Sequence, residues 1–123
     1  MRIPRDAVRL RIYLGETAKH EGQPLYEAIV LAARRHHLAG ATVLRGPLGF
    51  GHSSRLHTTK VLRLSEDLPL VIDIIDGPER IEAFLPVLEP MIGDRGLVTI
   101  EKIQVLRYGP NRECSGTSQS ISE

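Results

Sequence analysis

The sequence contains no tryptophan, a single cysteine and few aromatic residues of any kind. Two phenylalanines and three tyrosines make up 4% of the 123 residues. Because Cys114 is alone, an internal disulfide and a cysteine-based metal site are excluded within one chain. RNA recognition motifs stack bases on strand aromatics, and such residues are scarce here. We therefore expect no nucleic-acid partner.

Long hydrophobic runs are also absent. The uncharged stretches are too short to cross a bilayer, and residues 1–6 lack the apolar region of a secretory signal. A chain with 41% hydrophobic and 25% charged residues suits one soluble domain of ordinary composition. We therefore expect a single cytoplasmic domain.

Acidic residues are missing from a long middle segment. Residues 28–65 contain no aspartate or glutamate, but they carry five arginines, one lysine and four of the five histidines. Since the net charge of the chain is +1, this segment at +6 leaves −5 for the rest. Such an imbalance creates a local positive potential that favours phosphate, a nucleotide or an acidic partner.

A glycine-containing stretch within this segment, residues 48–55, is the strongest candidate for a binding site. Glycine allows a ligand to approach the backbone closely, and serine, histidine and arginine side chains donate hydrogen bonds. The candidate residues of this stretch are Gly49, Gly51, His52, Ser53 and Arg55.

Hydrophobic periodicity predicts four strands and two helices. Strict alternation over residues 8–14 is typical of a half-buried strand. Helical spacing follows twice, first from Pro24 with Gly40 as the stop, and then from Pro78. The predicted elements are strand 8–14, helix 24–38, strand 41–45, strand 68–75, helix 78–91 and strand 97–108.

Two local features of the second helix carry expectations of their own. Asp76 and Glu79 have the spacing of a capping box at its start. Pro86 lies inside it and predicts a kink or an early break, since proline removes a backbone donor. Beyond the last strand the sequence loses periodicity. We expect an N-terminal extension over residues 1–7, one domain over 8–109 and a disordered tail over 110–123.

The order β-α-β-β-α-β predicts an α+β fold, the ferredoxin-like plait, with an antiparallel sheet and both helices on one face. The first strand then lies between the third and fourth strands. Its uncovered face mixes cations, carboxylates and aliphatic residues, a composition that favours association over bare solvent. The residues expected there are Arg9, Arg11, Tyr13, Val71, Asp73, Ile75, Glu101 and Ile103. We therefore expect a homo-oligomer packed through its sheets.

Several segments resemble the PII-like superfamily of small trimeric signalling proteins, and more closely its uncharacterised branch. Residues 48–52 resemble the Gly-Phe-Gly that opens the large loop of PII proteins, and residues 68–74 resemble the strand that closes it. Residues 92–98 resemble the turn that grips nucleotide phosphates, and residues 106–109 resemble a strand-end arginine segment. The likeness spans residues 8–109.

This resemblance implies a homotrimer whose subunit clefts bind an anionic effector such as ATP, ADP or a cyclic nucleotide. It adds Gly93, Asp94, Arg95, Gly96 and Arg107 to the candidate residues, with Arg95 and Arg107 as a phosphate clamp. It also implies a non-enzymatic regulator that presents loop 51–67 to a target protein, such as a membrane transporter or channel. The turn lacks the lysine that contacts phosphate in PII proteins, so other anions remain open.

An alternative is a trimeric metal- or ion-responsive protein similar to the cation-tolerance relatives of this superfamily. His52 and His57 would then be the metal ligands, although no cysteine or carboxylate cluster accompanies them. A phosphate-ester hydrolase of the same plait is a third reading. The arginine-bearing glycine loop of acylphosphatases is not found after the first strand, where residues 15–18 read Gly-Glu-Thr-Ala.

Overall fold

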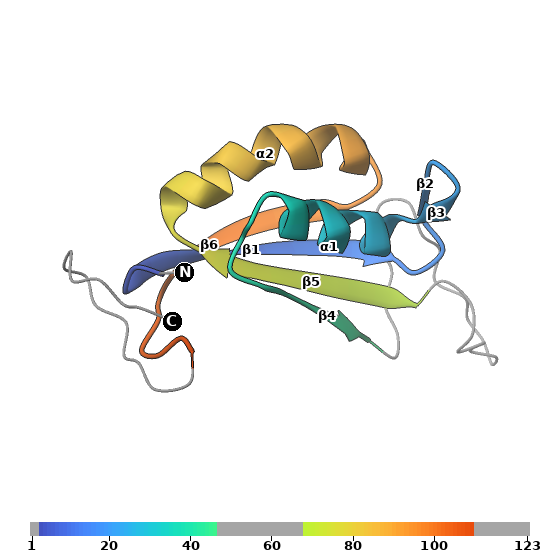
Figure 1. The fold of residues 1–123 in the computed structure, drawn as a ribbon. Helices are drawn as coiled ribbons and strands as arrows, with labels where there is room; N and C mark the ends of the chain where they lie inside the picture. Colours follow the sequence, from blue (N-terminus) through green and yellow to red (C-terminus); the bar gives the residue numbers. More distant parts are fainter. Residues whose placement is uncertain (1–2, 47–67, 110–123) are drawn as a thin grey trace.

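The computed structural model describes residues 3–46 and 68–109, which form a four-stranded sheet, a small two-stranded hairpin and two helices (Figure 1). The elements are β1 (Asp6–Gly15), β2 (Lys19–His20), β3 (Gln23–Pro24), α1 (Leu25–Arg35), β4 (Ala41–Arg45), β5 (Pro69–Asp76), α2 (Pro78–Ile92) and β6 (Leu97–Gln104).

The main sheet is antiparallel throughout and has the order β4-β5-β1-β6. The longest strand, β1, therefore lies between the third and fourth strands of the plait, as predicted. Both helices cover one face of this sheet (Figure 1). The predicted ferredoxin-like α+β fold is confirmed.

The main core fills the space between the sheet and the two helices. Leu10 and Ile12 of β1 point into it because alternate residues of a strand share one face. Phe84, among the largest fully buried side chains, enters from α2. Fully buried neighbours come from every layer, namely Leu25, Ile29, Ile72, Ile74, Ile81 and Leu88. Neither helix within residues 3–46 and 68–109 is long and apolar enough to cross a membrane.

The first helix ends earlier than the sequence predicts. It stops at Arg35, and His37, with φ of 60°, supplies the left-handed residue that was expected of Gly40. The amides of His37 and Leu38 donate to the carbonyls of Arg34 and Ala33, at 3.0 and 3.1 Å. These are the two hydrogen bonds of a Schellman motif, which satisfies helix carbonyls without needing glycine.

The second helix runs without interruption from Pro78 to Ile92. Of the two outcomes predicted for Pro86, a kink or an early break, the break is therefore wrong. Glu82, Pro86 and Pro90 are all exposed, which leaves the carbonyls that lose a helical donor accessible to water. The buried face of the helix, formed by Ile81, Phe84 and Leu88, holds it on the sheet.

The expected capping box is also wrong. Gly77 is the N-cap of α2, and no side chain caps the helix. Asp76 is instead fully buried, and its carboxylate accepts hydrogen bonds from the amides of Gly77 and Ala39 and from Nε of Arg80, at 2.7, 2.9 and 3.1 Å. It therefore joins the end of β5, the segment after α1 and the first turn of α2.

The other face of the sheet is partly covered by the chain itself. β1 begins at Asp6, two residues before the predicted start, and β6 ends at Gln104, before the predicted 108. After β6 the amide of Val105 donates to the carbonyl of Arg5 at 2.8 Å, and the Tyr108 hydroxyl donates to the carbonyl of Ala39 at 3.1 Å. A second apolar cluster forms there, around Ile3, Ala7, Ile75, Ile103, Val105 and Tyr108.

Candidate functional site

The turn between α2 and β6, residues 93–96, needs glycine at both ends for structural reasons. Gly93 has φ of 57° and ψ of −125°, a conformation that side chains other than glycine rarely adopt. A Cβ at Gly96 would lie 2.7 Å from the backbone oxygen of Tyr13. The turn therefore packs tightly against the end of β1.

The guanidinium of Arg95 is held by the backbone. Its Nη2 donates to the carbonyl of Met91 at 2.7 Å, its Nε lies 3.5 Å from the carbonyl of Ile92, and its Nη1 donates to the carbonyl of Lys19. Met91 and Ile92 are the last two residues of α2, so no later helical amide donates to their carbonyls. A cation at this end of the helix is therefore favourable. In this conformation Arg95 fastens the end of α2 to the β2–β3 hairpin.

Two of the turn's amides are also used within the turn. The amide of Gly93 donates to the carbonyl of Glu89, and that of Arg95 donates to the carbonyl of Ile92, both at 3.0 Å. A nest of consecutive amides is therefore not open for an anion in this conformation. Asp94 is exposed at the tip of the turn.

Arg107 lies at the other end of β6 and is exposed. The eight residues of β6 separate it from the turn, which is about 25 Å at the usual rise per strand residue. Figure 1 shows β6 running from the turn to the end of the sheet where β1 begins, and Gln104 is opposite Asp6 there. Within one chain, Arg95 and Arg107 therefore cannot hold the same phosphate.

The candidates of the glycine-containing stretch, Gly49, Gly51, His52, Ser53 and Arg55, lie outside the described residues, as does His57. The residues that flank the segment 47–67 are described. The amide of Gly46 donates to the carbonyl of Pro69, and that of Glu16 to the carbonyl of Leu68, both at 2.8 Å. Pro69 is opposite Gly15 in the sheet, so these flanks lie at the same end as Gly96.

No group of three or more potential metal ligands occurs among residues 3–46 and 68–109. The proposed histidine ligands are outside that part of the chain.

Ion pairs run across the middle of the uncovered face of the sheet. Arg11 and Asp73 stand opposite each other and share two hydrogen bonds, 2.7 Å from Nε to Oδ1 and 2.8 Å from Nη2 to Oδ2. Because Arg11 donates both hydrogen bonds to the carboxylate, they lower the pKa of Asp73 and raise the pKa of Arg11. Arg9 stands opposite Glu101 on β6, and its Nη2 donates to that carboxylate. The predicted composition of this face is confirmed.

An apolar row crosses the same face next to the ion pairs. The register places Leu44, Val71, Tyr13 and Leu97 side by side across all four strands. Leu44 and Leu97 are 54% and 57% exposed, and Tyr13 is 37% exposed. Because the described segments 3–5 and 105–109 pack on the far end of the face, this row has no cover within the described part of the chain.

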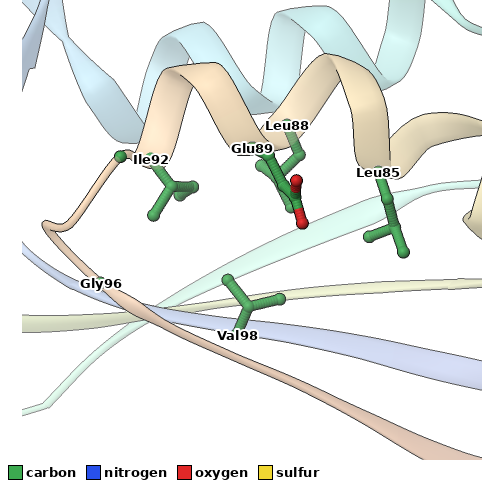
Figure 2. A pocket seen from close by; sticks show the side chains of 7 residues that line it. Leu85, Leu88, Glu89, Ile92, Gly96 and Val98 are labelled. Atoms are coloured by element: carbon green, nitrogen blue, oxygen red, sulfur yellow. The ribbon is translucent and has the colours of Figure 1, made fainter.

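A groove between α2 and β6 was not anticipated from the sequence. It has a volume of about 390 Å³ and is lined by Leu85, Leu88, Glu89, Ile92, Gly93, Gly96 and Val98. Figure 2 shows the side chains of Glu89 and Val98 facing each other across it. Two signals could have revealed it. Glu89 interrupts the apolar stripe of α2, and β6 is the end strand of a plait.

Comparison with known proteins identifies the family of this chain. A family model described as DUF190, uncharacterised ACR, matches residues 7–105. The chain belongs to this family. A UPF0166 protein from Aquifex aeolicus is 35% identical over 97 residues, which cover 79% of this chain and 90% of the relative.

This chain shares its fold with solved PII-like proteins. CPII from Thiomonas intermedia K12, a nitrogen regulatory PII-like protein bound to ADP, AMP and bicarbonate, superposes with a TM-score of 0.60 at 19% identity. The match covers 84% of this chain and 96% of CPII. A putative PII-like signalling protein from Thermus thermophilus gives 0.58 at 15% identity, covering 85% of this chain and 93% of that one. The predicted uncharacterised family and the predicted PII-like fold are both confirmed.

Proposed function

We propose that this DUF190 protein is a non-enzymatic regulator that acts as a homotrimer in the cytoplasm. Each cleft between two copies binds an anionic effector, an adenine nucleotide in the simplest case, and loop 51–67 is presented to a target protein. A membrane transporter or channel is the target we propose. The binding of ADP and AMP by CPII, a protein of the same fold, supports the choice of nucleotide.

The main support for this proposal is the distance between the turn 93–96 and Arg107. The two segments lie at opposite ends of β6, so one chain cannot assemble both around one ligand. A head-to-tail ring of copies brings the turn of one chain to Arg107 of the next, and such a ring closes with rotational symmetry. The site is therefore incomplete without a second copy.

The uncovered face of the sheet supports association of the copies. Leu44, Tyr13 and Leu97 form an exposed apolar row, and such contiguous patches mark interaction surfaces. Further along the same face, Nε of Arg9 is buried and has no hydrogen-bond partner in the described part of the chain. A buried donor without an acceptor is unfavourable, so an acceptor from a neighbouring copy would stabilise this face.

Within each cleft, Arg107 is the phosphate ligand that we expect to act without rearrangement, because it is exposed. Arg95 would first have to release the carbonyls of Met91 and Lys19. Gly49, Gly51, His52, Ser53 and Arg55 would contribute backbone and side-chain donors from the start of the loop, and Gly93, Asp94 and Gly96 would shape the wall of the cleft.

Isothermal titration calorimetry with ATP, ADP, AMP and cyclic AMP tests this function. We expect heat for at least one nucleotide and its loss in Arg107→Ala. Arg34→Ala removes an exposed arginine of α1 and is the matched control, which should bind as the native protein does. Nucleotide heat that Arg107→Ala leaves unchanged would contradict the site. Zinc heat lost in His57→Ala, without nucleotide heat, would favour the metal-responsive alternative.

A further inference from the structure

The groove between α2 and β6 has the features of a second binding surface. Its walls are aliphatic, formed by Leu85, Leu88, Ile92 and Val98, and its volume is about 390 Å³. Pockets of this size and character bind ligands when a few polar groups fix the orientation. In this groove the polar side chain is Glu89.

The carboxylate of Glu89 projects from α2 into the groove, toward Val98 on β6 (Figure 2). It has no hydrogen bond or ion pair within residues 3–46 and 68–109. A carboxylate beside aliphatic walls complements a lysine or arginine side chain, because the methylene groups pack on the walls while the cation reaches the charge.

Further acceptors lie on the same side of α2. Glu82 precedes Glu89 by seven residues, which is nearly two helical turns. Pro86 and Pro90 have no backbone N–H, so the carbonyls of Glu82 and Pro86 lose their helical donors. The exposed side of the helix therefore presents carboxylates and carbonyls, which match a ligand rich in donors.

The groove opens onto an edge of the sheet that pairs with no further strand among residues 3–46 and 68–109. β6 is the last strand in the order β4-β5-β1-β6, so alternate N–H and C=O groups along it face away from its neighbour β1. On the helix-covered side of β6, Val98 and Ile100 are still 37% and 50% exposed. An edge with exposed aliphatic side chains is a template for an added strand.

We propose that this groove and edge dock an extended segment of a partner protein, which adds to β6 as a further strand. The segment places a lysine or arginine side chain over Val98, with its cation on Glu89, and an aliphatic side chain two residues away over Ile100. Charge complementarity selects a basic segment, since Glu82 and Glu89 repel an acidic one. Gly93 and Gly96 border both this groove and the proposed effector cleft, but Glu89 and Val98 belong to the groove alone, so the inference does not rest on the proposed function.

The first test uses an array of eight-residue peptides in which apolar residues alternate with lysine, arginine, threonine or glutamate. Fluorescence anisotropy with the full-length protein measures their affinities. We expect the lysine and arginine peptides to bind about tenfold more tightly than the threonine peptides, and the glutamate peptides not to bind. Equal binding of acidic and basic peptides, or no binding of the basic ones, would overturn the proposal.

Two variants locate the binding site. Glu89→Gln keeps the shape of the side chain and should abolish the preference for basic peptides, whereas Glu79→Gln changes an exposed carboxylate in the first turn of α2 and should retain it. An unchanged preference in Glu89→Gln would overturn the proposal. Titration with ADP should be identical in both variants, which separates this site from the effector clefts.

Amide hydrogen exchange separates a partner protein from a second copy of this chain. Without peptide, the outward-facing amides of β6 should exchange rapidly, and a saturating lysine peptide should slow them. Slow exchange before any peptide is added would show that another copy already pairs with the edge, which would overturn the proposal.

Discussion

Arg11 on β1 and Asp73 on β5 stand opposite each other and are joined by two parallel hydrogen bonds, of 2.7 and 2.8 Å. This geometry holds the carboxylate in its ionised form, so the pKa of Asp73 is lowered. The pair occupies the middle of the uncovered face. On one side lies the apolar row of Leu44, Val71, Tyr13 and Leu97, and on the other the apolar cluster around Ile3, Val105 and Tyr108.

The Arg11–Asp73 pair predicts that stability falls in acid. Because the folded pKa of Asp73 lies below the unfolded value of about 4, the unfolded chain binds more protons in that range. The stabilisation is complete above about pH 4 and is lost as the pH falls through the folded pKa. Urea unfolding of the native protein and Asp73→Asn should show a difference at neutral pH that shrinks in acid. A difference independent of pH would contradict the assignment.

Gly96 is predicted to be intolerant of any side chain. Its Cβ would lie 2.7 Å from the backbone oxygen of Tyr13, and neither backbone can shift freely. We expect Gly96→Ala to lower the free energy of unfolding by about 1–3 kcal/mol, as overpacked sites do. Gly40→Ala is the control, since nothing lies within 4 Å of its Cβ and its φ is not positive. Equal effects of the two changes in thermal unfolding would contradict the close approach.

Arg95 and Arg107 are predicted to differ in how much each side chain contributes to the free energy of unfolding. Arg95→Ala removes the donors that hold the end of α2, so it should cost about 1–2 kcal/mol of stability without any ligand present. Arg107→Ala removes an exposed side chain and should leave unfolding within about 0.5 kcal/mol of the native value. Chemical denaturation of both variants measures these changes in the free energy of unfolding. A stable Arg95→Ala protein would show that the carbonyl contacts are not structural.

Asp76 is predicted to be the most sensitive polar position of the described fold. Asp76→Ala would leave the buried amide of Gly77 and the amide of Ala39 without acceptors, and would release Arg80. We expect a loss of about 2–4 kcal/mol, because each orphaned buried donor costs about 1–3 kcal/mol. Glu79→Ala, three residues further along, should change stability by less than about 0.5 kcal/mol. Comparable losses in the two variants would contradict the assigned network.

The sequence predicted the layers and the topology because the periodicities were strong. Alternation in β1 and the apolar stripes of the two helices fixed which faces were buried, and the order of elements then left one economical plait. The same alternation correctly placed Arg9, Arg11 and Tyr13 on the uncovered face, beside Asp73 and Glu101.

Features that depend on tertiary contacts escaped prediction. The first helix is ended by His37 in the left-handed conformation and not by Gly40. The hydrogen bonds donated by the amides of His37 and Leu38 outweigh the cost of the positive φ of His37. The helix α2 continues through Pro86 because the packing of its buried side holds it on the sheet. Asp76 does not form the expected capping box because its carboxylate accepts a hydrogen bond from the amide of Ala39, which is distant in sequence. The distance between Arg107 and the turn 93–96 became apparent only once β6 was seen to separate them.

Light scattering of the purified protein across a range of concentrations is the most direct test of shared clefts between copies. We predict a mass of three chains of 13.7 kDa each, and a lower mass in Leu97→Glu, which places a charge in the apolar row. A native mass equal to one chain at every concentration would contradict the proposed regulatory function.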